Sequence, residues 1–320
     1  MENIFLRNSE LRVSKMALGT MYFGWKTPDA EGLRQMDEYS EAGGSFIDTA
    51  NVYSRRLAPD KDFYGKDFKE YREGVSERLI GKWLKGKRRE DFVIASKVGF
   101  RYPGIELGTS PKQIREECEK SLIRLGTDYI DLYYLHMDDE NTTLESSLYT
   151  LTELKREGKI RYIALSNFKT SRIIEADGIC EKEGFTKPVC AQQKYTYLKP
   201  KSDAHFGRQA AIDRELLEYA KETGLSLLAY SPLLSGYYKD RTKKIPEQYL
   251  RSDIDEKMNA LNSVARELSV TPTQLVYAWM LNSKPEVLPI VAVSNSEQFR
   301  EALSAFELKI PEDLMNELNK

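Results

Sequence analysis

Histidine and cysteine are scarce in this sequence, and their scarcity excludes several kinds of site. The 320 residues include only two His and three Cys. Two histidines are too few for a His-rich metal centre. Wide spacing of the cysteines rules out a disulfide scaffold and a Cys-x-x-Cys zinc site; they are Cys118, Cys180 and Cys190. We therefore predict that no metal is bound.

A strong net charge and long hydrophobic runs are also absent. Lys and Arg number 48 against 50 Asp and Glu, a formal net charge of -2, which gives no electrostatic footprint for a nucleic-acid partner. No apolar run approaches the roughly 18 residues of a membrane helix. Residues 1–8 do not resemble the start of a signal peptide. These absences predict a cytoplasmic enzyme that binds neither nucleic acid nor membrane.

Short apolar segments alternate along the chain with longer segments of helical periodicity. Hydrophobic residues make up 41% of the sequence, enough for a sizeable core. Eight segments are continuously apolar and rich in β-formers, which indicates parallel strands covered on both faces. They span residues 16–19, 45–48, 92–97, 129–136, 162–166, 189–195, 225–230 and 288–293.

A helical segment follows each predicted strand, which indicates an α/β protein of right-handed βαβ units. Eight units favour a (β/α)8 TIM barrel over a doubly wound sheet, and no Gly-x-Gly-x-x-Gly follows an early strand. A β-hairpin of residues 4–6 with 11–13 is expected to close the N-terminal end of the barrel. No linker divides the chain, so we predict a single domain over residues 1–320, with extended loops at the C-terminal face.

Two helix starts can be read from local sequence. Ser110 and Thr271 are each followed by Pro and, at the third position, by Gln. A hydroxyl side chain before Pro, with Gln three residues on, is typical of a capped helix N-terminus. We therefore predict that helices begin directly after both residues.

Ionisable side chains stand where three neighbouring strands end. Asp48 ends one predicted strand, with Tyr53 five residues on; Lys97 ends the next, and His136 the third. Active sites of such barrels lie at the C-terminal strand ends, so these four side chains should meet on one rim. A buried lysine needs a carboxylate partner, which Asp48 can supply. Each residue alone has an ordinary structural explanation, but the four together favour a catalytic site.

The motifs around these residues are similar to those of the aldo-keto reductase family. The resemblance extends over essentially the whole chain, with six segments in the family's order. They are 46–53 (Phe-Ile-Asp-Thr-Ala-x-x-Tyr), 74–81 (Gly-Val-Ser-Glu, then Leu-Ile-Gly), 95–97 (Ala-Ser-Lys), 131–136 (Asp-Leu-Tyr-Tyr-Leu-His), 164–168 (Ala-Leu-Ser-Asn-Phe) and 229–233 (Ala-Tyr-Ser-Pro-Leu). Six ordered matches make the resemblance specific.

The resemblance implies NAD(P)H-dependent interconversion of a carbonyl and an alcohol. Tyr53 takes the position of the general acid and base. A free tyrosine titrates at about 10, and Lys97, held cationic by Asp48, would favour the phenolate and lower that pKa. His136 would orient and polarise the carbonyl oxygen. These four residues form the predicted catalytic set.

The resemblance also places the cofactor. Tyr230 matches the aromatic residue that stacks on the nicotinamide ring, and the loop after the seventh strand matches the cover of the pyrophosphate. The predicted cofactor residues are Gly19, Thr20, Asp48, Ser166, Asn167, Gln192, Tyr230, Ser231, Leu233, Ser235, Gly236, Ser294, Asn295 and Gln298. The basic stretch 236–256 is either a strap over the cofactor or a solvated loop.

One departure from the family concerns the adenosine 2′-phosphate. Family members that prefer NADPH usually place Lys or Arg in the turn after the eighth strand, but residues 292–298 contain neither. NADP(H) stays the cofactor that the family favours, and this departure makes NAD(H) the alternative. Arg300 would restore a cation if it turned inward, although an exposed helical position is expected.

A second departure concerns the substrate. Residues 55–73 form a long charged and aromatic loop after Tyr53, and loops after barrel strands set specificity on this fold. The predicted substrate contacts are Trp25, Tyr53, Arg101, His136 and Asp138. A polar and aromatic rim suits a hydroxylated small molecule such as a sugar or polyol. The oligomeric state is not predicted.

Two other functions are compatible with the same residues. Lys97 could act as the Schiff-base nucleophile of an aldolase. The chain could also be a cofactor-binding regulatory module without turnover, since the family includes channel-associated subunits. The complete set of four predicted catalytic residues favours the enzyme.

Overall fold

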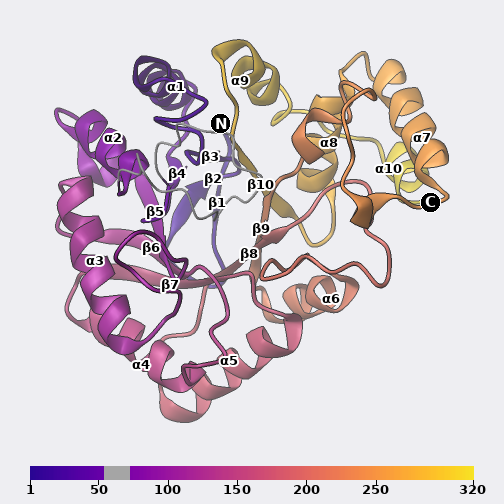
Figure 1. The fold of residues 1–320 in the computed structure, drawn as a ribbon. Coiled ribbons are helices and arrows are strands. Elements are labelled where there is room, and N and C mark those ends of the chain that lie inside the picture. Colours follow the sequence, from indigo (N-terminus) through magenta and orange to yellow (C-terminus); the bar gives the residue numbers. More distant parts are fainter. Residues whose placement is uncertain (54–72) are drawn as a thin grey trace.

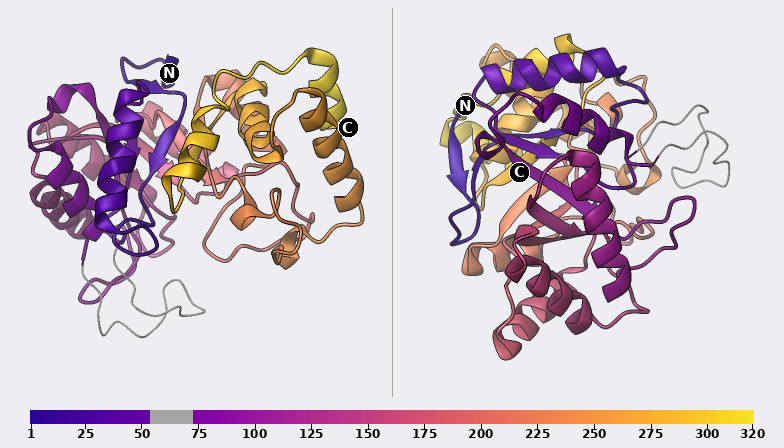
Figure 2. Two further views of the ribbon diagram at one scale, coloured as in Figure 1. Left: turned by 90° about the horizontal axis from the view of Figure 1, so that it is seen from above. Right: turned by 90° about the vertical axis from the view of Figure 1, so that its left-hand side faces the viewer.

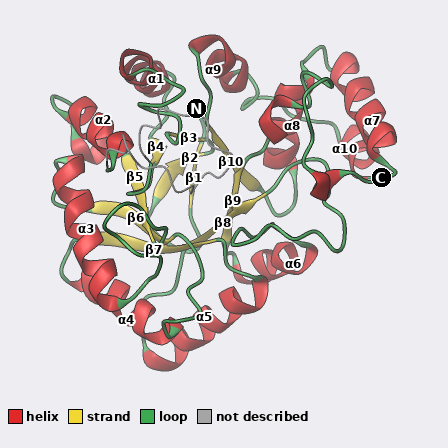
Figure 3. Ribbon diagram, in the orientation of Figure 1, coloured by secondary structure: helices red, strands yellow, loops and turns green. Residues whose placement is uncertain are grey.

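Eight parallel strands close into a barrel, so the predicted (β/α)8 fold is confirmed (Figures 1 and 3). The computed structural model describes residues 1–53 and 73–320. Around the barrel the strands follow the order β10-β3-β4-β5-β6-β7-β8-β9. Their bounds are β3 (Ala17–Gly19), β4 (Phe46–Asp48), β5 (Val93–Val98), β6 (Ile130–Leu135), β7 (Ile160–Ser166), β8 (Cys190–Lys194), β9 (Ser226–Tyr230) and β10 (Val287–Val291).

Helices surround the barrel and cover the outer faces of its strands (Figure 2). Within the described residues, none of them is both long and apolar enough to cross a bilayer. The helices are α1 (Asp29–Glu41), α2 (Val75–Leu84), α3 (Pro111–Leu125), α4 (Leu144–Arg156), α5 (Thr170–Glu183), α6 (Arg214–Thr223), α7 (Ile254–Glu267), α8 (Pro272–Asn282), α9 (Ser296–Leu303) and α10 (Glu312–Asn319), with the short 3-10 helices η1 (Arg89–Asp91), η2 (Leu234–Gly236) and η3 (Glu247–Tyr249).

The barrel strands are buried on both faces, which explains their continuous apolar sequence. In β6, Tyr133 and Leu135 belong to the large core between strands and helices. Leu132 and Tyr134, which point the other way, belong to the core inside the barrel. Successive residues of a strand alternate in direction, so each must be apolar when both sides are covered.

The N-terminal hairpin closes the end of the barrel where the strands begin. It consists of β1 (Asn3–Phe5) and β2 (Arg12–Ser14), paired antiparallel and shifted by one residue from the predicted ranges. Leu6, Leu11 and Val13 are buried in the same core as Phe46 and Val93, which begin β4 and β5. Because this end is filled by side chains, the opposite end is left for a site.

Both predicted helix starts carry the expected caps. The Ser110 side chain accepts a hydrogen bond from the backbone N–H of Gln113 at the start of α3. Thr271 and Gln274 form a reciprocal capping box at the start of α8. Such caps satisfy backbone N–H groups that have no partner within the helix.

Gly81 allows α2 and α3 to approach closely. A Cβ at this position would lie 2.5 Å from the backbone oxygen of Arg124 and 2.8 Å from that of Leu125. Gly178 in α5 provides a matched control, because a Cβ there would meet no described atom within 4 Å.

We expect Gly81→Ala to lower the free energy of unfolding by about 1–3 kcal/mol, because the two helices must move apart to admit the methyl group. Gly178→Ala should instead raise it by about 0.5–1 kcal/mol, because alanine has the higher helix propensity. Urea denaturation of both variants tests this difference in sign. A Gly81→Ala protein as stable as Gly178→Ala would contradict the close approach.

Candidate active site

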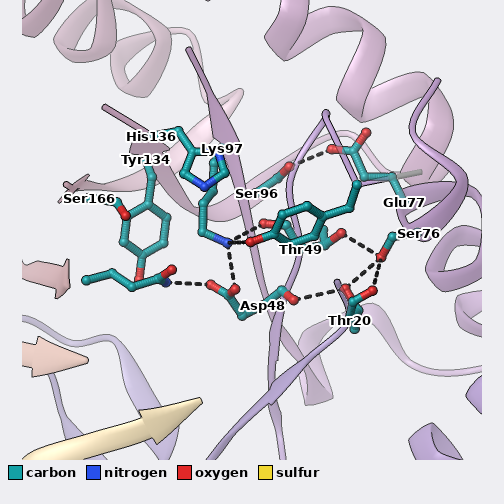
Figure 4. A network of polar contacts seen from close by, with 12 residues as sticks. Thr20, Asp48, Thr49, Ser76, Glu77, Ser96, Lys97, Tyr134, His136 and Ser166 are labelled. Carbon is teal, nitrogen blue, oxygen red and sulfur yellow. Dashed lines mark hydrogen bonds and ion pairs between the residues drawn. The ribbon is translucent and has the colours of Figure 1, made fainter. Parts of the chain in front are cut away.

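The four predicted catalytic side chains meet at the C-terminal ends of β4, β5 and β6. Asp48 is the last residue of β4, Lys97 lies in β5, and His136 directly follows β6. Lys97 Nζ donates hydrogen bonds to Asp48 Oδ1 at 2.6 Å and to the Thr49 carbonyl at 2.7 Å (Figure 4). The hydroxyl of Tyr53 lies 3.5 Å from the same Nζ. The strand ends therefore place an ion pair directly beside a phenol.

The Asp48–Lys97 ion pair is almost completely shielded from solvent. Lys97 is 0% and Asp48 2% exposed. Burial lowers the pKa of Lys97, and the charges of Asp48 and Glu77 oppose this shift. The second oxygen of Asp48 accepts a hydrogen bond from Gln192 Nε2 at 2.8 Å. A buried ammonium with a carboxylate and a carbonyl as partners is held at one fixed position.

The imidazole of His136 lies beside two aromatic rings. Burial lowers its pKa well below the usual value, and the charge of Lys97 adds to this effect. The centroid of its ring lies 6.0 Å from that of Tyr53 and 4.6 Å from that of Phe100. Nδ1 has no hydrogen-bond partner among the described residues. A neutral imidazole can donate a hydrogen bond without adding positive charge to the site.

A pocket of about 600 Å³ opens beside this cluster. It is lined by Tyr53 and His136 as well as by Gln298 of α9, so it extends from the ion pair to the last barrel helix. The predicted cofactor residues line it, with the exception of Asn295. The side chain of Asn295 instead caps α9 by accepting a hydrogen bond from the Gln298 N–H.

Strained backbone occurs at three residues of this pocket. Asn167, Ser231 and Ser235 line it and have φ angles of 62°, 56° and 57°, a region that non-glycine residues rarely occupy. Asn167 is held by Tyr230, whose hydroxyl donates to its Oδ1 at 2.6 Å, and its Nδ2 donates to the His136 carbonyl at 2.9 Å. Strain of this kind is typical of functional sites.

Three of the predicted substrate residues are not among the described residues that line the pocket. Asp138 forms an ion pair with Arg172 on α5. Trp25 packs against Tyr22, and Arg101 lies on the loop after β5. The loop predicted to set specificity, with Arg55, Arg56, Asp60, Phe63, Tyr64, Phe68 and Tyr71, lies outside the described residues.

Three lysines that were not predicted as site residues also line the pocket. Lys239 and Lys243 lie in the basic stretch 236–256, whose charge was the available signal. Lys26 follows β3 on a loop that contacts the turn after β10, because Thr27 Oγ1 donates to the Val293 carbonyl at 3.1 Å. This contact places a lysine-bearing loop against the cation-free residues 292–298. Nothing local in the sequence indicates it.

Arg300 does not supply a cation to the pocket. It forms an ion pair with Glu38 on α1 at 2.9 Å, and 69% of its side chain is exposed. Lys239 is partly neutralised, because its Nζ lies 3.2 Å from Glu301. Lys243 donates to the Ser235 carbonyl at 3.3 Å.

The pocket's donor and acceptor groups fit a dinucleotide. Hydroxyl and amide side chains of Ser166, Asn167 and Gln192 line the same pocket as the predicted catalytic residues Asp48, Tyr53 and His136. The loop after β9 and the lysines also line it, and they supply groups that attract phosphate. A ligand that carries both a polar ring and phosphates would match these groups.

Comparison with known proteins agrees with the geometry. Residues 15–320 match the model of the Aldo/keto reductase family. The chain is 31% identical over 334 aligned residues to the uncharacterized oxidoreductase YrpG of Bacillus subtilis, with 100% of this chain and 95% of that protein covered. It is 29% identical over 325 residues to the aldo-keto reductase str7 of Strobilurus tenacellus, with 94% and 86% covered.

The solved structures include a similar fold. The thermostable aldo-keto reductase Tm1743, crystallised with the inhibitor epalrestat, matches with a TM-score of 0.75 at 29% identity and covers 100% of this chain and 99% of that chain. The chain belongs to the aldo/keto reductase family.

Proposed function

We propose that this protein is an NAD(P)H-dependent reductase that interconverts a carbonyl and an alcohol, with Tyr53 as the general acid and base. The observation that carries the proposal is the 3.5 Å contact between the Tyr53 hydroxyl and the buried ammonium of Lys97. A cation at this distance favours the phenolate form of tyrosine and so eases proton release. Membership of an oxidoreductase family supports the same chemistry.

Each of the predicted catalytic residues has a separate role in the proposed carbonyl reduction. When bound, a reduced nicotinamide would supply the hydride. Tyr53 would donate its hydroxyl proton to the carbonyl oxygen, and Lys97 would stabilise the phenolate left behind. His136 would donate a hydrogen bond to the same oxygen and orient it. Asp48 would keep Lys97 charged and in place.

The lysines lining the pocket bear on which cofactor is used. Residues 292–298 contain no cation, which leaves NAD(H) as the alternative to NADP(H). Lys26, however, lies on the loop that contacts this turn through Thr27. Its ammonium is 4.8 Å from the Tyr22 ring centroid and 4.7 Å from that of Trp25, so both rings hold it near the pocket. We therefore favour NADP(H).

Lys26→Met is expected to raise KM for NADPH about fivefold and to leave KM for NADH within about twofold, because an exposed charge contact is worth about 1 kcal/mol. Steady-state kinetics with both cofactors give the comparison. Lys85→Met serves as the control, since Lys85 lies at the far end of α2 and does not line the pocket. Equal effects on NADPH and NADH would contradict a role for Lys26 in phosphate recognition.

The substrate we propose first is a hydroxylated carbonyl compound such as a sugar. Gln209 supplies a polar group to the described part of the pocket. A second candidate, an aromatic aldehyde, is favoured by the rings of Tyr22 and Phe100, which line the same pocket.

A panel of sugars, polyols, aromatic aldehydes and simple aldehydes, each with NADPH and NADH, tests the proposed function. Oxidation of the cofactor is followed by its absorbance. We expect turnover with at least one carbonyl class. Cofactor binding without turnover of any compound would instead support the regulatory module.

A further inference from the structure

A carboxylate outside the pocket joins two of the loops that carry pocket residues. Glu117 of α3 is 0% exposed and does not line the pocket. Its Oε2 accepts hydrogen bonds from Asn51 Nδ2 at 2.7 Å and from the Tyr102 hydroxyl at 2.5 Å. Its Oε1 accepts one from Lys120 Nζ at 2.8 Å. One oxygen atom therefore faces two loops, and the other faces a cation.

Asn51 belongs to the segment 49–53, which forms hydrogen bonds with Lys97. It lies between Asp48 and Tyr53 in the sequence. Its backbone N–H donates to the Lys97 carbonyl at 3.3 Å, while its side chain reaches Glu117. Tyr53 lies two residues further on, so its position depends on a segment that is held by hydrogen bonds to Lys97 and to Glu117.

Tyr102 belongs to the loop after β5, the strand next to β4 in the barrel. Two residues before it, Phe100 lines the pocket and packs its ring against His136. The Tyr102 hydroxyl has a second acceptor, Glu73 Oε1, at 3.2 Å. Loss of the Glu117 carboxylate would therefore disturb the segment of Asn51 more than the loop of Tyr102, because Tyr102 would keep Glu73 as an acceptor.

Helix stability alone does not account for this arrangement. The Lys120–Glu117 pair is an ordinary i,i+3 contact, and 40% of the Lys120 side chain is exposed, so the pair contributes little to stability. Burying a carboxylate completely is unfavourable unless hydrogen bonds compensate for the lost hydration. Here the compensating hydrogen bonds are charge-assisted and come from two loops that carry pocket residues.

We propose that Glu117 is a positioning residue that sets the distance between the Tyr53 loop and the Phe100 loop. The inference rests on the proposed function, because it concerns the placement of the general acid and of the substrate wall. Misplacement of a reacting group by about 1 Å costs about 10²-fold in rate. Glu117 acts only through Asn51 and Tyr102.

Glu117→Gln tests the proposal, because it keeps the shape and removes the charge. We expect kcat to fall about tenfold or more, because a slight displacement of the Tyr53 hydroxyl is enough to cause a loss of this size. KM for the carbonyl substrate should rise. Kd for NADPH, measured by quenching of protein fluorescence, should stay within about twofold. Glu116→Gln is the control, since Glu116 is the neighbouring residue on α3 and its side chain is 52% exposed.

Two further variants separate positioning from a general loss of folded protein. Asn51→Ala should mainly lower kcat, because it releases the Tyr53 segment. Tyr102→Phe should mainly raise KM for the carbonyl, because it loosens Phe100. If the variants were merely destabilised, the fraction of active protein and the apparent kcat would fall in all three variants, and KM would stay unchanged. That result would overturn the proposal. The active fraction is measured by the stoichiometry of NADPH binding.

The outcomes also distinguish this inference from the proposed function. Turnover by the natural protein, with Glu117→Gln matching Glu116→Gln in kcat and KM, would overturn the role of Glu117 alone. Binding of NADPH without turnover of any carbonyl by the natural protein would overturn both.

Discussion

Tyr53→Phe is expected to lower kcat for carbonyl reduction by about 10²- to 10⁴-fold, the usual contribution of a positioned general acid. The substitution removes the hydroxyl that lies 3.5 Å from Lys97 Nζ and keeps the ring that packs against His136. The shape of the pocket should therefore change little. Steady-state kinetics with the best carbonyl of the substrate panel measure the effect.

Binding of NADPH supplies the control for this variant. Kd for the cofactor should stay within about twofold of that of the natural protein, because the proposed role of Tyr53 is proton transfer to the substrate. A Tyr53→Phe protein that retains full turnover would exclude the proposed mechanism.

The surroundings of Lys97 bear on the aldolase alternative. Lys97 Nζ is fully buried and donates hydrogen bonds to Asp48 and to the Thr49 carbonyl, so a ketone would have to displace these partners before a Schiff base could form. Borohydride trapping of a ketone on Lys97 without nicotinamide would favour the aldolase.

Asp48→Asn is expected to reduce the free energy of unfolding by about 3–5 kcal/mol, because it leaves the buried Lys97 ammonium without its carboxylate. Asp48→Asn combined with Lys97→Met should recover much of this loss, since no uncompensated charge then stays buried. Urea denaturation of the two single variants and the double variant gives the coupling energy directly.

Activity and an exposed ion pair provide the controls. The double variant should be stable yet inactive, because it lacks the cation beside Tyr53. Asp255→Asn breaks the ion pair with Arg241 on the surface, where the two side chains are 84% and 44% exposed, and should cost no more than about 1 kcal/mol. If Asp48→Asn lowered the free energy of unfolding no more than Asp255→Asn, the buried Asp48–Lys97 pair would not be required for stability.

Local sequence determined the strands, the two helix caps and the convergence of the predicted catalytic residues. A strand covered on both faces must be apolar throughout, so β4, β5 and β6 could be located from their residues alone. Parallel strands of a barrel end on the same rim. Asp48, Lys97 and His136 could therefore be expected to meet from their positions at or just after strand ends.

Closure of the barrel decided the contacts between distant segments, which no local sequence pattern predicts. Pairing of β10 with β3 brings the two ends of the chain together, so the loop with Lys26 contacts residues that lie more than 260 positions later. The same closure turned Arg300 toward Glu38. Contacts between such distant segments depend on three-dimensional packing, and single-sequence periodicity carries no information about them.

Side-chain pairing across loops was equally beyond the sequence. Asp138 looked like a rim residue, but its carboxylate pairs with Arg172. Nothing in the sequence distinguishes Glu117 from the other charged residues of α3, but packing buries it and turns one of its oxygens toward two loops. Periodicity shows which residues can form a core. Which charged groups are taken from water, and by which partners they are then stabilised, is decided only when the helices and loops pack against the barrel.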